Sequence, residues 1–279
     1  MFPRQVRIGA SVGLLAVASA QRSAAQELLL QIRPRAGDTL RMRLDQETDL
    51  TGAGVTRASI GPATTIWRMA MFSRAIIESE SNYETAVLAV TDSVLFRSTD
   101  ERSIASARQI ENQLKGQRVR FRVTPEGLLA IEPAAGAPRE VAHVVSLMPA
   151  TFPKGPIKVG DSWMREMPLP SGTQLGAQLS GTLHVTLRLD SVTHAGDLAF
   201  VSMRGEMQPA TGPGAASQAV LEKGTVRGTM VLDRKRGWLS ESWFSVLVLT
   251  SVTNPPAASA LRTEMRITQH MRTAERRDR

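Results

Sequence analysis

The sequence predicts a mainly β protein with two or three short helices, in which a duplicated antiparallel unit forms a curved sheet or an open half-barrel. Apolar and polar residues alternate with a period of two through most of the chain after residue 26, which is typical of strands with one buried face. Turn residues also recur in the same order in two halves of the chain. With 279 residues, 42% of them hydrophobic, the chain can bury a large core although it has no cysteine.

Residues 1–25 have the pattern of a cleaved signal peptide. Arg4 and Arg7 form a basic head, residues 8–19 are apolar and uncharged, and small residues follow at 18–20 and 23–25. The apolar run is shorter than the roughly 20 residues that a membrane-spanning helix needs. Since the chain has no cysteine for lipidation, we expect an exported protein that is periplasmic or secreted.

The first β repeat is expected at residues 26–148. Alternation predicts strands at 39–50, 64–80, 83–94, 118–123 and 128–132. Apolar residues at helical spacing predict helices at 103–115 and 139–148. The alternation is cleanest in the segment RVRFRV at 118–123, so its three arginines should lie on the solvent side of the sheet.

The second β repeat is expected at residues 149–273, after a boundary rich in proline and glycine at 149–160. Alternation there predicts strands at 183–192, 198–207, 224–232, 238–252 and 261–271. A flexible loop is predicted at 209–217, and the charged tail at 274–279 is expected to fray.

The duplication is predicted from shared landmarks. Gly37-Asp38 is followed by Thr and a large apolar residue, and Gly160-Asp161 is followed by Ser and Trp. Later in each half, Lys-Gly (115–116 and 223–224) leads through Val-Arg to a glycine and two apolar residues. Single turns of this kind recur by chance in β proteins, so the prediction depends on their shared order.

The same residues resemble a known family. The segments PKGPIKVGDSW (153–163) and GTMVLDRKRGWL (228–239) are similar to bacterial exported proteins defined by a domain of unknown function with a "kvGdsW … fD … G-l" pattern. Leu232 stands where that pattern more often has Phe. The resemblance implies an envelope location and β architecture, and it brings no catalytic residues.

No catalytic or cofactor signature emerges from the sequence. The pattern G-x-S-x-G at 9–13 lies inside the predicted leader, and the four histidines (His143, His184, His194 and His270) are scattered. Two imidazoles without a carboxylate cluster make a poor metal site. We therefore expect a protein that is not an enzyme and that has no cofactor or metal.

Four large apolar residues are candidate ligand contacts. Trp67, Met69 and Met71 lie on one side of a long predicted strand, where they either fill a core or line an adaptable cavity. Trp163 follows Asp161-Ser162, and it either stacks on a ligand or plugs the core while its neighbours bond the turn.

The expected partners are a lipid or another apolar molecule and, through Arg118, Arg120 and Arg122, anionic components of the envelope. The arginines also fit a solvated outer strand face that discourages edge pairing. With a single tyrosine, nucleic acid is not expected. The sequence thus suggests an exported, non-enzymatic protein that binds a lipid or other apolar ligand against a curved sheet; the alternative is a structural or protein-interaction module of the envelope without a small ligand.

Overall fold

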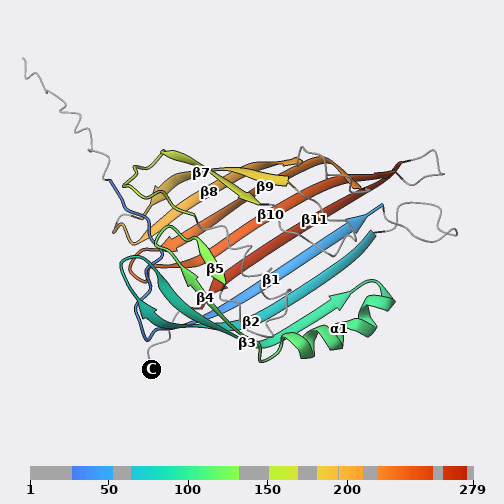
Figure 1. Ribbon diagram of the computed structural model, residues 1–279, viewed down its shortest axis with the longest axis horizontal. Helices are drawn as coiled ribbons and strands as arrows, with labels where there is room; N and C mark the ends of the chain where they lie inside the picture. Colours follow the sequence, from blue (N-terminus) through green and yellow to red (C-terminus); the bar gives the residue numbers. More distant parts are fainter. Residues whose placement is uncertain are drawn as a thin grey trace, which may run out of the picture.

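The computed structural model describes residues 27–52, 64–131, 151–168, 181–193, 195–209, 219–253 and 260–274. Within these residues the chain forms one antiparallel sheet of 11 strands and one helix (Figure 1). The predicted signal peptide, the predicted helix at 139–148 and nearly all of the predicted loop at 209–217 and tail at 274–279 lie outside the described residues, as do His143 and His194.

The first half of the sheet contains β1 (Thr39–Thr51), β2 (Thr64–Glu80), β3 (Thr85–Ser98), β4 (Arg118–Val123) and β5 (Leu129–Ile131), with α1 (Glu101–Leu114) between β3 and β4. The second half contains β6 (Ser162–Pro168), β7 (Gly181–Val192), β8 (Leu198–Pro209), β9 (Ala219–Asp233), β10 (Trp238–Thr253) and β11 (Ala260–Thr273). Most strands lie within two residues of their predicted bounds, since alternation marks a strand along its length. Strand β3 ends four residues later and β9 begins five residues earlier than predicted, and no bounds were predicted for β6.

The strand order is β5-β4-β3-β2-β1-β11-β10-β9-β8-β7-β6. Each half is a meander, and the first strand of one half pairs with the last strand of the other along Met42–Thr51 and Glu264–Thr273. The sheet is curved and its outer strands β5 and β6 do not pair with each other. The predicted fold class is confirmed, as an open sheet and not a closed barrel.

One face of the sheet, here called the inner face, carries most of the core. In β4, for example, Val119, Phe121 and Val123 are buried, and the arginines between them are exposed. The core continues over the second half of the sheet through residues such as Leu187 and Leu189. The opposite, outer face carries many charged side chains together with apolar ones such as Phe72, Leu95 and Leu247.

Two segments without regular structure cross the inner face at one end. We call residues 27–38 the N-terminal strap and residues 151–161 the middle strap. Leu28 and Ile157 join them by a pair of backbone hydrogen bonds of 2.8 and 2.9 Å. Leu30 and Phe152 are completely buried and belong to the main core. The straps therefore cover this end of the inner face.

The N-terminal strap also shows how strongly the sheet curls. Ile32 N donates to Pro125 O at 2.8 Å, and Arg33 N donates to Gly237 O at 2.7 Å. Pro125 lies in the turn after β4 and Gly237 in the turn before β10, and four strands separate β4 from β10 in the sheet. Because neighbouring residues reach both turns, the sheet must curve around the inner face.

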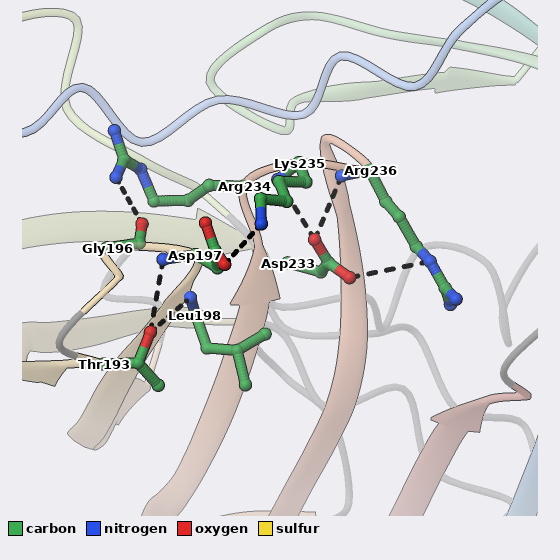
Figure 2. A network of polar contacts seen from close by, with 8 residues as sticks. All are labelled: Thr193, Gly196, Asp197, Leu198, Asp233, Arg234, Lys235 and Arg236. Carbon is green, nitrogen blue, oxygen red and sulfur yellow. Dashed lines mark hydrogen bonds and ion pairs between the residues drawn. The ribbon is translucent and has the colours of Figure 1, made fainter.

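Turns at the strap-covered end of the second half are fastened to each other (Figure 2). Lys235 Nζ bonds Asp197 Oδ2 at 2.6 Å, and Arg234 donates its guanidinium to the Gly196 carbonyl. Asp233 accepts from the backbone N–H groups of Lys235 and Arg236, both at 3.0 Å. These contacts tie the β7–β8 turn to the β9–β10 turn.

Helix α1 protects an exposed strand edge. Strand β3 pairs with β4 only between Thr85 and Val90, so the rest of its edge would be free to pair with other chains. The helix lies beside this part of β3 (Figure 1). Phe96 N donates to Glu111 Oε1 at 2.7 Å, and Leu114 packs against Val94. The helix begins two residues before its predicted start.

The two Gly-Asp turns make matching hydrogen bonds. Gly37 N donates to Ile77 O and Ile77 N donates to Asp38 O; Gly160 N donates to Leu189 O and Leu189 N donates to Asp161 O. Both glycines have positive φ, and a strand irregularity follows directly after both Ile77 and Leu189. The duplication itself remains a prediction, and these contacts are the structural features that it would explain.

Candidate functional site

The inner face differs between its two ends. At the closed end, defined by the straps, Leu40, Ala75 and Ile77 are buried in the main core. At the open end, where β1 finishes and β2 begins, several large apolar side chains of the inner face, such as Trp67 and Met265, are only partly buried. A sheet face that is sealed at one end and partly exposed at the other is a candidate binding surface.

Strand register places the open-end residues in rows across four strands, β2, β1, β11 and β10 in that order. One row is Met69, Gln46, Gln269 and Phe244. The next row toward the open end is Trp67, Thr48, Ile267 and Val246. The last is Thr65, Leu50, Met265 and Val248. Directly opposed side chains on one face lie about 5 Å apart, so these rows form a continuous surface.

We call the partly exposed apolar members of this region the open-end surface: Leu50, Trp67, Met69, Met71, Val246, Met265 and Ile267. None of the three rows contains a charged residue. Methionine side chains are flexible and polarisable, so they adapt to irregular apolar shapes. The surface can therefore cover an apolar chain, and it offers no group for acid–base or nucleophilic chemistry.

Over β8 and β9 the inner face is filled by its own side chains. A Cβ at Gly224 would lie 2.5 Å from Met207 Sδ, and one at Gly228 would lie 2.8 Å from Met203 Cε. The glycines thus leave room for methionines to lie across the sheet, and Met203 and Met207 are buried there. This part of the face is a packed core and not a surface open to a ligand.

The predicted ligand contacts fall in two places. Trp67, Met69 and Met71 lie together on the inner face of β2, as part of the open-end surface. Trp163 lies on β6 at the other side of the sheet. Its Nε1 donates to Thr151 O at 2.9 Å, and its ring packs against the main core. The structure brings the first three residues together and gives Trp163 a contact with the middle strap.

Sequence reasoning missed the contribution of the C-terminal strands. Val246, Met265 and Ile267 belong to the open-end surface because β11 pairs with β1. The alternation in β10 and β11 identifies which residues share a face. This alternation does not identify β1 as the strand that pairs with β11. The residues of the open-end surface could therefore not be predicted as one group from the sequence.

The outer face is rich in ion pairs. Arg68 bonds Glu47 at 2.5 Å and Arg74 bonds Asp92 at 2.8 Å. Of the arginines that could bind anions, Arg120 pairs with Glu78 at 3.2 Å and Arg122 pairs with Glu84. Arg118 has no ion pair with a described residue. Two of the three predicted anion contacts are therefore already paired with carboxylates.

A depression of about 360 Å³ lies on the same outer face, lined by Arg41, Met42, Phe72, Ser73, Arg74 and Asp92. Three of these side chains have partners: Arg74 and Asp92 form an ion pair, and the Arg43 guanidinium lies 5.2 Å from the Phe72 ring centre. These contacts are internal to the sheet, and they leave the depression without an obvious ligand.

The described histidines each have one acidic neighbour. His184 Nδ1 lies 3.3 Å from Glu166, and His270 Nε2 lies 2.6 Å from Glu241. Over the described ranges no three His, Cys, Asp or Glu side chains gather in the way a metal ion needs. In the same part of the chain, no helix has the length and apolar character to cross a membrane.

Two carboxyl groups at opposite ends of the sheet have shifted pKa values. Burial, with a smaller contribution from the charge of Glu47, raises the pKa of Asp49 on β1. A hydrogen bond from the Thr124 hydroxyl lowers the pKa of Glu126, which lies in the turn that the middle strap contacts. The surroundings of Glu126 thus favour its ionised form, and those of Asp49, on the outer face of β1, disfavour it.

Comparison with known proteins shows a similar fold. No protein-family model and no curated protein matches the sequence. The chain is similar to lipovitellin, from a structure describing lipid–protein interactions in that protein, with 9% sequence identity and a TM-score of 0.53. The match covers 86% of this chain and 25% of the lipovitellin chain. This likeness shows the fold alone, and the chain corresponds to about a quarter of lipovitellin's length.

A second solved structure, of DynF from the dynemicin biosynthesis pathway of Micromonospora chersina, aligns over 99% of this chain and 95% of its own. Its sequence identity is 9% and its TM-score is 0.24. At that TM-score the alignment supports no inference.

Proposed function

We propose that the protein is an exported, non-enzymatic carrier that holds a lipid or another apolar chain against the open-end surface. The observation that supports this most is the contrast within one sheet: three uncharged rows include partly exposed apolar side chains such as Trp67 and Met265, whereas Leu40, Ala75 and Ile77 at the other end are buried. The likeness in fold to lipovitellin, whose structure is titled for its lipid–protein interactions, is consistent with this proposal.

The energetics suit such a ligand. Burying one methylene gains about 0.8 kcal/mol, so a chain with about ten buried methylenes gains about 8 kcal/mol before the cost of association. That cost and the ordering of flexible methionines reduce the net gain, and micromolar affinity is a reasonable expectation.

The first test is native mass spectrometry of the protein purified from its own envelope. We expect an adduct with the mass of a lipid, and its loss after extraction with organic solvent. A protein that carries no adduct and takes up no added long-chain alcohol would contradict the carrier role, and would favour an interaction module of the envelope. The N-terminal sequence of the purified chain tests export, since a start near residue 26 is expected.

A second test uses adjacent residues on opposite faces of β2. Met69→Gln keeps nearly the same size and places an amide on the open-end surface, where burying it under a ligand costs about 1–3 kcal/mol. We expect it to weaken binding of radiolabelled hexadecanol about tenfold. The control is Arg68→Gln on the outer face, which loses an exposed ion pair with Glu47 and a favourable charge near Asp49 and should bind like the unaltered protein.

A further inference from the structure

Two glutamines lie side by side in the middle of the open-end region. Gln46 on β1 and Gln269 on β11 are directly opposed in register at the seam between the two halves. Their neighbours in the same row are Met69 and Phe244. In the rows on either side, the residues next to Gln269 on β11 are Met271 and Ile267. On β1, Gln46 lies between Leu44 and the buried Thr48. The two glutamines and Thr48 thus form a small polar cluster bordered by apolar side chains.

Neither amide is satisfied by the protein. The Oε1 atoms of both Gln46 and Gln269 are buried and have no hydrogen-bond partner in the described residues. Gln269 is only 5% exposed. Gln46 Nε2 donates a long hydrogen bond to Thr48 Oγ1, at 3.5 Å. A buried polar atom without a partner destabilises a fold, and in native proteins most such atoms have one.

An apolar residue would fit both positions with no such penalty. Leu44 and Met271 form the preceding opposed pair of the same two strands, and both are buried. Leu or Met at these two positions would therefore pack better than the Gln pair. Polar groups placed in an apolar pocket usually fix the orientation of a ligand.

We propose that Gln46 and Gln269 bind the polar head of an amphipathic ligand whose apolar chain covers the open-end surface. This inference rests on the carrier function proposed above. The amide pair offers both donors and acceptors, so it matches a head that can donate and accept hydrogen bonds. A hydroxyl or a carboxamide fits this description.

The same surroundings disfavour an ionised head. In the three rows around the pair, no lysine or arginine lies on the inner face of β2, β1, β11 or β10. A carboxylate or phosphate buried there would lack a counter-charge, and burying an unpaired charge is far more costly than burying a hydroxyl. The ligand class is therefore a neutral amphiphile, such as a long-chain alcohol, a monoacylglycerol or a fatty amide.

The geometry gives the ligand a direction. With the head at the Gln pair, the chain would extend over Ile267 and Met265 toward the open end, since the closed end is filled by the straps. Four residues of strand separate Gln46 from Leu50, a span of roughly 13 Å at about 3.3 Å per residue. A chain of that length would cover the last two rows.

The test compares ligands that share a chain and differ in the head. Binding of hexadecanol, palmitamide, palmitate and a pyrene-labelled alkane without a polar head is measured by equilibrium dialysis at pH 8 with the delipidated protein. We expect hexadecanol and palmitamide to bind at least tenfold more tightly than palmitate. In the double variant Gln46→Leu/Gln269→Leu, we expect hexadecanol affinity to fall about tenfold while the headless chain binds as before or more tightly.

Gln113→Leu, at an exposed position on α1, controls for a general effect of replacing Gln by Leu and should change neither affinity. Thermal unfolding checks that the double variant folds, and it should be more stable without ligand because the unsatisfied amides are gone. Two outcomes would contradict the head-binding role and leave the carrier function standing. In the first, the ratio of hexadecanol affinity to headless-chain affinity is the same in the double variant as in the unaltered protein. In the second, palmitate binds the unaltered protein as tightly as hexadecanol does. If none of the four ligands binds the unaltered protein, the carrier function fails as well.

Discussion

The two ends of the inner face are built from the same strands and differ in what covers them. At the closed end, Leu30 and Phe152 from the two straps fill the space above the sheet and are completely buried. At the open end, Met69 and Met265 carry similar apolar side chains that remain partly exposed. The alternation within each strand sets which side chains lie on the inner face. The straps then bury the inner-face side chains at one end, which become part of the core.

This difference separates stability from function. Substitutions at the closed end should change the free energy of unfolding, because each one removes buried contacts. Substitutions at the open end should change ligand affinity with less effect on the free energy of unfolding, because truncating a partly exposed side chain removes fewer buried contacts. Each prediction below tests whether that division holds.

The largest effect is expected for Phe152→Ala in the middle strap. Its side chain is fully buried, and its backbone N–H bonds Glu126 O at 2.6 Å. Removing the ring should lower the free energy of unfolding by about 3–5 kcal/mol, measured by urea denaturation. Met265→Ala at the open end should cost clearly less. Equal losses for the two variants would contradict the distinction between the ends.

A somewhat smaller loss is expected for Gly237→Ala. Gly237 has a φ of +61°, and a Cβ there would lie 2.1 Å from Arg33 O in the N-terminal strap. The strap must shift away from the turn, which should destabilise the protein by about 1–3 kcal/mol. Gly155→Ala in the middle strap is the matched control, because its Cβ meets no atom within 4 Å. A neutral Gly237→Ala variant would show that the strap does not need this contact.

At the open end, Met265→Gln should affect binding and not folding. The new amide would be buried under the ligand on β11, and we expect hexadecanol affinity to fall about tenfold, or by about 1.4 kcal/mol. Arg266→Gln, the next residue, removes a surface ion pair with Glu264 at 3.4 Å and a favourable charge near Asp49, both on the outer face, and should bind normally. If only Met69→Gln and not Met265→Gln weakened binding, the ligand would not cross the seam between the halves.

The smallest effects are pH-dependent and have opposite signs at the two ends. The lowered pKa of Glu126 means that its ionised form stabilises the fold, a contribution lost as the pH falls through that pKa. The raised pKa of Asp49 means that its ionisation destabilises the fold, and this penalty develops as the pH rises through the aspartate value of the unfolded chain.

At pH 7, Glu126→Gln should therefore destabilise the protein and Asp49→Asn should stabilise it, each by about 0.5 kcal/mol or less. Both differences should be smaller at pH 3 than at pH 7, because protonation removes the ionised forms that produce them. Urea denaturation at the two pH values measures them, and shifts of the same sign for both variants would contradict the assignment.

Much of the fold could be predicted because the signal is local. The bounds of β2 and β4 match their predictions, since alternation over a whole strand is visible in the sequence. The edge-to-edge joining of β1 with β11 depends on residues about 220 positions apart, and no local pattern encodes it. The straps were missed for a similar reason: Leu28, Leu30 and Phe152 are buried by long-range contacts and not by a periodic pattern.

The candidate site was predictable only in part. Trp67, Met69 and Met71 share a strand, so their common face follows from spacing. Gln46 and Gln269 look like ordinary polar positions of amphipathic strands, and their unusual character appears only when the register places them together on the inner face. Trp163 is distinctive in sequence, yet its indole bonds the middle strap.

The most direct test of the carrier account is a crystal structure of the protein with 12-bromododecanol, in which anomalous scattering locates the bromine. The account predicts one bromine site near Leu50 and Met265, with the hydroxyl at the Gln46–Gln269 pair. A bromine site on the outer face, among the straps, or at no defined position would contradict it.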